Sequence, residues 1–263
     1  MNLVNEQQME IDGVLNINIS CKDTNIALFK SDTSSIRIKE YKSIGRSKDA
    51  LNMDKSSETI NITEGKLPLF FGAVRYTTEV YLPETFAGNI SLEIGTGNVQ
   101  LNDNFTFDSF TAQCSDGHIN VNEVTSRKIK LQTSSGKVRC GIISGDIEIL
   151  TKDGGIFINQ LNGNILANAK SGKIQCTVTK PMEKIILITG DGGITLNIPK
   201  DLYFRFTAKT SNRIKAPFRD RLSRPVTDNN TYQGIVGEKA NGSEPVDINI
   251  NAKDYRVTVD WIE

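Results

Sequence analysis

The feature that most constrains this chain is a short phrase that recurs between residues 96 and 216: a small polar residue, then usually glycine, then polar and apolar residues in alternation. The second residues of successive phrases are 18 to 20 positions apart. A fixed period of this size indicates a repeat architecture, in which each unit buries its apolar face against the next. The phrases are TGNVQL (96–101), DGHINV (116–121), SGKVRC (135–140), DGGIFI (153–158), SGKIQC (171–176), DGGITL (191–196) and SNRIKA (211–216).

Each period contains two short strands. Apolar and polar residues alternate within each phrase, which is the pattern of a β-strand with one buried face. Glycine at the turns would let the chain take positive φ at little steric cost. The sequence therefore predicts an all-β fold, a single-stranded parallel β-solenoid (β-helix) of about seven coils. A weaker alternating series lies between the phrases, at 88–92, 108–112, 127–131, 145–149, 163–167, 183–188 and 203–206.

The period also predicts the register of the coils. Coils that stack in phase place equivalent residues about 4.8 Å apart along a parallel ladder. Residues 137–140 should then pair with 155–158, and not form a hairpin with 146–150. The first inward ladder is predicted to contain Val99, Ile119, Val138, Ile156, Ile174, Ile194 and Ile214, and the opposite wall Phe110, Ile129, Ile147 and Ile165.

The cysteines fit the same alternation. Cys140 and Cys176 occupy one inward position two coils apart, which is beyond the reach of a disulfide. Cys114 follows Ala112 in the inward phase. We therefore predict that all three are core thiols.

The segments outside the repeats divide the chain into three parts. Residues 1–87 are predicted to form an N-terminal β-region that caps the solenoid, 88–216 the repeats, and 217–263 a loop with C-terminal capping strands. Caps are expected because the terminal coils would otherwise expose open sheet edges. The apolar segment LPLFFGAV (67–74) is predicted to be core of the N-terminal cap, with an exposed partner-binding loop as the alternative.

The run VYLPETFAGNISLEIGTGNVQL (80–101), followed by the SGKV, SGDI and DGGI phrases, resembles a bacterial adhesin-like family of β-strand repeats, a domain of unknown function. The resemblance spans most of the chain. It implies a parallel β-solenoid of bacterial origin, similar in style to bactofilins and to the head domains of autotransporter-like adhesins. It assigns no catalytic residues.

Composition limits the classes of function. Lys plus Arg equals Asp plus Glu at 31 each, so no global field favours nucleic acid, and no specific nucleic-acid partner is expected. The N-terminus lacks a basic region followed by an apolar core, and no apolar run reaches the ~18 residues of a membrane span. We expect no transmembrane segment and a cytoplasmic location, with association to the cell envelope left open.

Little in the sequence indicates catalysis or metal binding. His118 is the single histidine, and the alternation that buries Ile119 points it outward. No nucleophile motif and no C-x-x-C pair accompany it. The turn residues alternate between Asp and Ser, which does not supply the repeated oxygen ligands that calcium requires. We predict no catalytic residue, no cofactor and no metal.

The most informative outward surface is a strip of cationic residues with one aromatic. Because successive phrases keep an 18-residue step here, its members should lie on three adjacent coils. Such a strip could bind an anionic polymer or another protein, although Lys and Arg that merely solvate the sheet are the alternative. The residues of this binding strip are Lys137, Arg139, Phe157, Lys173 and Gln175.

The sequence thus favours a non-enzymatic structural or interaction module, an adhesin-like β-solenoid that binds a polymer or protein partner. A bactofilin-like assembly scaffold is the alternative, and a glycan-acting enzyme is a weaker one. A homo-oligomer stays open.

Overall fold

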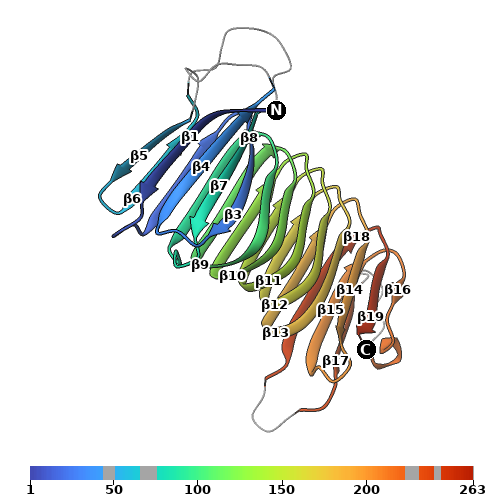
Figure 1. The fold of residues 1–263 in the computed structure, drawn as a ribbon. Helices are drawn as coiled ribbons and strands as arrows, with labels where there is room; N and C mark the ends of the chain where they lie inside the picture. The colour runs from blue at the N-terminus through green and yellow to red at the C-terminus, as the bar shows by residue number, and fades with distance from the viewer. Residues whose placement is uncertain (44–50, 66–75, 223–230, 240–243, 263) are drawn as a thin grey trace. The chain divides into compact units, whose positions relative to one another are not determined.

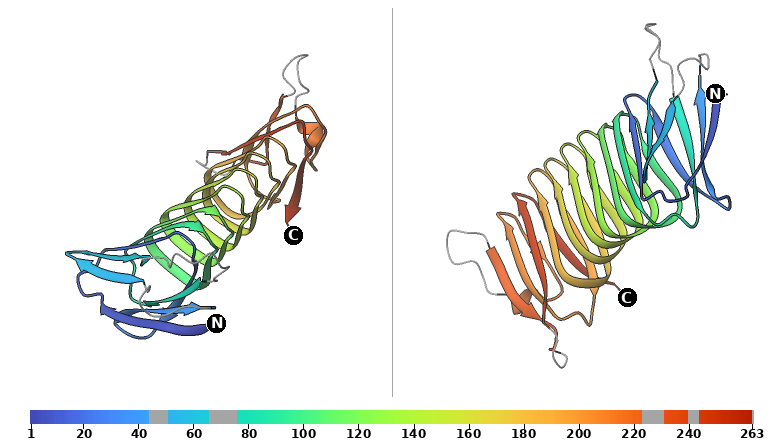
Figure 2. Two further views of the ribbon diagram at one scale, coloured as in Figure 1. Left: turned by 90° about the horizontal axis from the view of Figure 1, so that it is seen from above. Right: turned by 90° about the vertical axis from the view of Figure 1, so that its left-hand side faces the viewer.

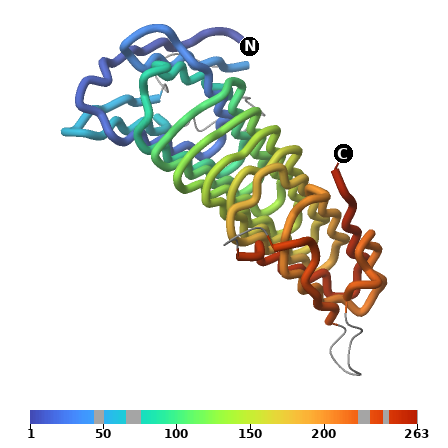
Figure 3. Tube along the Cα trace, turned by 90° about the horizontal axis from the view of Figure 1, so that it is seen from below, coloured from blue at the N-terminus to red at the C-terminus, as the bar shows by residue number. Residues whose placement is uncertain are grey.

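The computed structural model describes residues 1–43, 51–65, 76–222, 231–239 and 244–262. They form 19 β-strands and one short 3-10 turn, and fall into two compact units, Met1–Thr133 and Ser134–Glu263. Within each unit the chain winds in successive coils (Figures 1 and 3). The predicted parallel β-solenoid is confirmed.

The strands of the N-terminal unit are β1 (Asn2–Glu10), β2 (Asn16–Cys21), β3 (Asn25–Ser31), β4 (Ser35–Lys42), β5 (Asn52–Ser56), β6 (Thr59–Thr63), β7 (Tyr76–Pro83), β8 (Asn89–Thr96), β9 (Val99–Asp116) and β10 (Ile119–Thr133). The elements of the C-terminal unit are β11 (Val138–Thr151), β12 (Ile156–Ala169), β13 (Ile174–Thr189), β14 (Ile194–Pro199), β15 (Phe204–Thr210), β16 (Ile214–Lys215), the turn η2 (Arg219–Arg221), β17 (Thr231–Val236), β18 (Val246–Lys253) and β19 (Val257–Ile262).

The repeats of the C-terminal unit pair in the predicted register. Val138 lies beside Ile156, which lies beside Ile174, and Ile174 lies beside Ile194. All four side chains are buried. The predicted pairing of 137–140 with 155–158 is therefore confirmed, and a hairpin between 137–140 and 146–150 is excluded.

A column of glycines at the turns explains why the phrase needs this residue. A Cβ on Gly154 would lie 1.5 Å from the carbonyl oxygen of Gly136, and one on Gly172 would lie 2.1 Å from that of Gly154. Neither Gly154 nor Gly172 has positive φ. For these two glycines the predicted reason, positive φ, is wrong: close stacking of backbone on backbone excludes a side chain. Positive φ occurs at Gly97, Gly145 and Gly163.

Buried threonines fix the same turns. The Thr151 hydroxyl donates to the carbonyl of Gly154 at 2.5 Å, and the Thr189 hydroxyl donates to that of Gly172 at 2.7 Å. Burying a hydroxyl is costly unless it is hydrogen-bonded, so these residues satisfy turn carbonyls that water cannot reach.

The last strands of the chain lie inside the stack of coils, not beyond it (Figure 2). On one wall Ile248 of β18 lies between Ile185 of β13 and Phe206 of β15. On the other wall Val257 of β19 lies between Ile194 and Ile214. The predicted direct stacking of Ile194 on Ile214 is therefore wrong. The strands β18 and β19 alternate in the same phase as the repeats, so they can form a coil as well as a repeat unit can. The period alone therefore does not show that they are inserted.

The N-terminal unit contains a matching insertion. Ile17 of β2 lies between Ile60 of β6 and Ile90 of β8. Leu28 of β3 lies between Val80 of β7 and Leu101 of β9. From β8 onward the coils follow chain order, with Val99 beside Ile119 and Phe110 beside Ile129.

Antiparallel strands complete the N-terminal unit. Strand β4 pairs antiparallel with both β1 and β7, and β5 pairs antiparallel with β6. The inward face of β4 continues from Ile36 and Ile38 to Glu40 and Lys42, whose side chains are only 4% and 2% exposed. The Lys42 Nζ lies 3.2 Å from Glu40 Oε1, and the Leu51 backbone N–H donates to Glu40 Oε2 at 3.0 Å. A buried ion pair therefore replaces apolar core at this point.

The four cysteines are unpaired and buried, as predicted for three of them. Cys140 and Cys176 are separated by Ile158, which pairs with both. Burial raises the pKa of the Cys140 and Cys114 thiols to about 12. Burial, with the negative charges of Glu64 and Glu40, raises the pKa of Cys21 to about 12. These thiols stay protonated at neutral pH and behave as small apolar side chains.

The division at Thr133 and Ser134 falls within the predicted repeats. The three-part division at residues 87 and 216 stays a prediction about folding units, although the C-terminal strands lie within the stack. The segment 67–74 lies outside the described residues.

Candidate functional site

The binding strip lies on the outer face of three neighbouring strands of the C-terminal unit. Arg139 of β11 pairs with Phe157 of β12, which pairs with Gln175 of β13. Alternation explains their orientation, because Val138, Ile156 and Ile174 beside them point inward. Arg139 and Gln175 are exposed and Phe157 is half-buried. The strip is thus a continuous row across three rungs of the ladder.

Two cations of the strip flank the aromatic ring. The guanidinium carbon of Arg139 lies 5.6 Å from the centroid of the Phe157 ring, and the Nζ of Lys173 lies 5.3 Å from it. Both distances are within the range of a cation–π interaction. The ring therefore holds two long side chains close together, which lowers the conformational entropy they lose when a ligand binds.

Glycine at position 155 makes room for this arrangement. A Cβ there would lie 2.9 Å from Cε2 and 3.1 Å from Cζ of Phe157. The ring thus folds back over the backbone of Gly155. That position lies between the rungs of Lys137 and Lys173, both of which are exposed.

The chemistry of the strip suits binding more than catalysis. It presents three cationic groups, one apolar ring and one amide on a flat sheet, with no carboxylate or histidine among its members. Arginine forks and lysine ammonium groups bind phosphate, sulfate or carboxylate oxygens through charge-assisted hydrogen bonds. That the strip binds a ligand stays a prediction.

Sequence reasoning missed the continuation of this face. Beyond Gln175 the same row contains Thr195 of β14, Thr258 of β19 and Lys215 of β16. The insertion of β19 brings Thr258 and its neighbour Arg256 onto the face. No local signal marked Arg256, because the segment around it follows the loop region at 217–245 and lacks the repeated phrase.

A second aromatic cluster lies on the outer face of the N-terminal unit, where sequence reasoning placed no site. Arg37 and Lys39 lie 4.8 and 5.3 Å from the ring centroid of Tyr81, which also stacks on Phe29 at 5.3 Å. Here a carboxylate joins the cluster, since Glu79 accepts a hydrogen bond from the Tyr81 hydroxyl at 2.8 Å. Burial and that hydrogen bond raise the pKa of Tyr81 to about 12. Because Glu79 and Glu6, which lies 3.9 Å from Arg37, offset these two cations, this cluster is a weaker site for anions than the binding strip.

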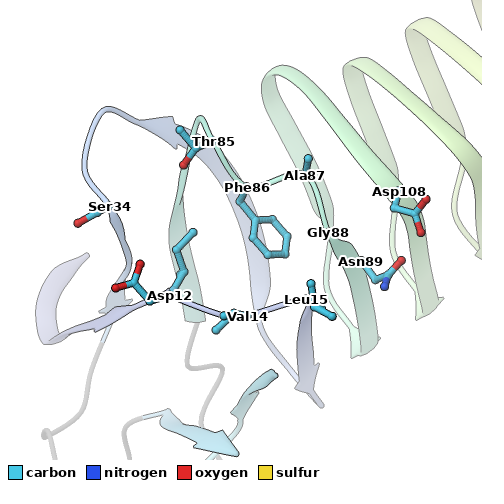
Figure 4. A pocket seen from close by; sticks show the side chains of 12 residues that line it. Asp12, Val14, Leu15, Ser34, Thr85, Phe86, Ala87, Gly88, Asn89 and Asp108 are labelled. Atoms are coloured by element: carbon cyan, nitrogen blue, oxygen red, sulfur yellow. The ribbon is translucent and has the colours of Figure 1, made fainter. Parts of the chain in front are cut away.

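The N-terminal unit also contains an open cavity of about 620 Å³. Figure 4 shows Phe86 in the middle of its lining, with Asp12 and Asp108 on either side. Arg127 donates two hydrogen bonds, of 3.0 and 2.9 Å, to the Asp108 carboxylate. These bonds lower the pKa of Asp108. The described lining contains no His, Cys or Lys, and the hydroxyl of its Ser34 donates to Glu10 Oε2 at 3.0 Å.

The remaining candidates can be placed. His118 is exposed, and its backbone N–H donates to the side-chain oxygen of Asn98 at 2.8 Å. Among the described residues, no group of three or more His, Cys, Asp and Glu could hold a metal ion. Within the same residues, no helix has the length and apolar character needed to cross a membrane.

Comparison with known proteins gives a family. Two solved structures resemble the chain at 12% sequence identity: one from Clostridium sporogenes described as a "putative cell adhesion protein", and one from Bacteroides fragilis described as a "putative adhesin". The first covers 98% of this chain and 99% of its own length with a TM-score of 0.34, and the second covers 98% and 96% with 0.37. No curated protein matches the chain significantly. The model of the family described as Toastrack DUF4097 matches residues 14–258, and the chain therefore belongs to this family.

Proposed function

We propose that this protein is a non-enzymatic, adhesin-like interaction module that binds an anionic polymer through the binding strip. The observation that supports this most directly is the pair of cations held against Phe157, at 5.6 and 5.3 Å from its ring. A flat wall with groups repeated every ~4.8 Å suits a repeating ligand better than a small metabolite, which needs a concave pocket.

The test is binding of two anionic polymers, poly(glycerol phosphate) and polygalacturonate, at low and high salt. Replacing Lys137, Arg139 and Lys173 by Ser should abolish binding and leave the melting temperature unchanged, because all three side chains are exposed. Each exposed ionic contact contributes about 0.2–1 kcal/mol, so binding should also weaken at high salt. The matched control replaces Lys180, Lys184 and Lys209 by Ser, which removes the same charge from other exposed positions of the unit.

Two results would contradict the proposal. Either the unaltered protein binds neither polymer at low salt, or the strip variant and the control variant bind equally well. Mass photometry of the same samples tests the scaffold alternative, since a scaffold requires self-association into filaments or large oligomers.

A further inference from the structure

A longer row of residues, which shares Lys137 and Lys173 with the binding strip, runs along the edge where each coil enters its inward ladder. Consecutive backbone hydrogen bonds connect its rungs: the amides of Val138, Ile156, Ile174, Ile194 and Val257 donate to the carbonyls of Gly155, Lys173, Gly193, Arg256 and Arg213. The row therefore crosses six rungs without interruption, in the order Lys137, Gly155, Lys173, Gly193, Arg256 and Arg213.

The side chains of this row are either cationic or absent. Lys137, Lys173, Arg256 and Arg213 are exposed, and the rungs between the first three belong to glycines. Phe157 folds over Gly155, whereas a Cβ on Gly193 would meet only the Arg256 carbonyl oxygen, at 3.3 Å. The row thus leaves an open place between Lys173 and Arg256.

Acidic groups border the row at its turns. Asp153, Asp191 and Asp254 lie two residues earlier, at the turns, and Asp254 is bonded to the Ser211 hydroxyl. Among the described residues, neither Lys173, Arg256 nor Arg213 forms an ion pair. A cationic row with a carboxylate border on one side favours a ligand that runs along the row rather than across it.

We infer that the binding strip is one end of a longer anion-binding surface, the cationic row of Lys137, Lys173, Arg256 and Arg213, and that its ligand is a linear polyanion. This inference rests on the proposed function. Six rungs span five steps of ~4.8 Å, or about 24 Å. Cations lie two rungs apart up to Arg256, and Arg256 and Arg213 then lie on adjacent rungs.

The geometry makes two demands on the ligand. It must be long enough to reach from Lys137 to Arg213, because each contact is weak by itself and only their combination gives affinity. It must also carry its charges in line, since the sheet is flat and the aspartate border repels anions that branch toward the turns. Arg256 directly precedes the inserted strand β19, so the full surface exists only when the C-terminal strands occupy their place in the stack.

The test uses inorganic polyphosphate of defined length as the probe, with calorimetry or fluorescence anisotropy at low salt. Four proteins are compared: the unaltered chain, the binding-strip variant, Arg213→Ser with Arg256→Ser, and the charge-matched control Lys184→Ser with Lys209→Ser. We expect affinity to rise from tripolyphosphate to long chains. The Arg213 and Arg256 variant should lose long-chain affinity by about two- to thirtyfold, as two exposed contacts would predict, and should bind tripolyphosphate at the strip unchanged.

The outcomes separate this inference from the proposed function. If the strip variant loses binding while the Arg213 and Arg256 variant matches the control, the proposed function stands and the longer row is wrong. If affinity does not increase with polymer length, the linear-ligand inference is wrong even where the strip binds. If the unaltered chain binds no polyphosphate and neither polymer of the preceding test, both fail together.

Discussion

The two ends of the chain are built into their units in the same way but are held by different chemistry. At the N-terminus, β2 and β3 lie between the coil of β6 and β7 and the coil of β8 and β9. At the C-terminus, β18 and β19 lie between the coil of β13 and β14 and the coil of β15 and β16. We call these the N-terminal and C-terminal inserted coils. Both coils have an apolar interior. The first is bordered by amide ladders and lies near the buried pair of Glu40 and Lys42, whereas the second has an outer ion pair.

The order of synthesis separates the two insertions further. The N-terminal inserted coil exists before its neighbours, so they can add to it from either side. The C-terminal inserted coil is made last and must enter between coils that could already have paired with each other. Those coils have the same alternation and period, so the direct register of Ile194 on Ile214 is a physically reasonable competitor.

Removing the C-terminal inserted coil should have the largest effect. In a chain that ends at residue 239, β13, β14, β15 and β16 lose a partner strand, and the C-terminal unit either fails to fold or closes in the competing register. We expect its cooperative melting transition to disappear or to move to a much lower temperature. Calorimetry measures the transition, and proteolysis shows whether the N-terminal unit is still protected.

Engineered cysteines distinguish these two results. Thr195 and Lys215 both pair with Thr258, so they lie two rungs, ~9.6 Å, apart in the full chain. A disulfide between Thr195→Cys and Lys215→Cys should form only in the shortened chain, whereas Thr195→Cys and Thr258→Cys should cross-link the full chain. Efficient cross-linking of the first pair in the full chain would mean that β19 is not inserted.

Substitutions at the buried ion pair should change the free energy of unfolding less than removal of the C-terminal inserted coil, but more than a core substitution in that coil. Glu40→Gln removes the carboxylate that lies 3.2 Å from the Lys42 ammonium and should reduce the free energy of unfolding by about 3–5 kcal/mol. The double variant Glu40→Leu with Lys42→Met should recover part of that loss, because apolar residues replace both charges while the buried Leu51 N–H loses its acceptor. In the C-terminal inserted coil, Ile250→Val should cost only about 0.5–1.5 kcal/mol. Denaturant unfolding measures all three, and a double variant as unstable as Glu40→Gln would show that the pair itself is not the cause.

This contrast also explains which parts of the fold the sequence could predict. Period and alternation predicted the register from Val138 to Ile194, because each coil there pairs with the next coil along the chain. They did not predict Val257 beside Ile194, because pairing between distant segments leaves no trace in a local period. They also did not predict Glu40 on an inward face, since a buried charge depends on a partner that alternation does not identify.

The candidate site follows the same division. Arg139, Phe157 and Gln175 could be placed on one row from an unbroken 18-residue step. The contact of Phe157 with Gly155 could not be predicted from the sequence, because it depends on the rotamer of the ring. Arg256 could not be placed either, because its position on the face depends on the inserted coil.

Substitutions that remove hydrogen bonds at the turns of the inserted coils should have an intermediate effect on the free energy of unfolding. The buried Thr210 hydroxyl donates to the Tyr255 carbonyl at 2.6 Å and accepts from the Asn212 N–H at 3.1 Å. Thr210→Val leaves both groups without this partner and should cost about 1–3 kcal/mol. Asn25→Ala, the N-terminal counterpart, removes bonds to Tyr76 and Asn98 in a half-buried position and should cost less, because water can replace them. Thr207→Val on the outer face of β15 is the control, and a loss as large as that of Thr210→Val would refute the assignment.

Substitutions on the outer faces of the two inserted coils should have the smallest effects on stability. The two effects should differ clearly in their salt dependence. Arg205 Nη1 lies 2.8 Å from Asp247 Oδ1, with the two side chains 54% and 42% exposed. Asp247→Asn should therefore cost at most about 1 kcal/mol at low salt and almost nothing at high salt, where the charges are screened. On the N-terminal inserted coil, the Asn89 amide donates to Asn16 Oδ1 at 2.9 Å. Asn16→Ala should cost about 0.5–1.5 kcal/mol at any salt concentration, because a bond between neutral groups is not screened. Urea unfolding at two salt concentrations measures both variants. If the cost of Asn16→Ala also vanished with salt, or that of Asp247→Asn did not, the two coils would not be held by the different chemistry that their side chains indicate.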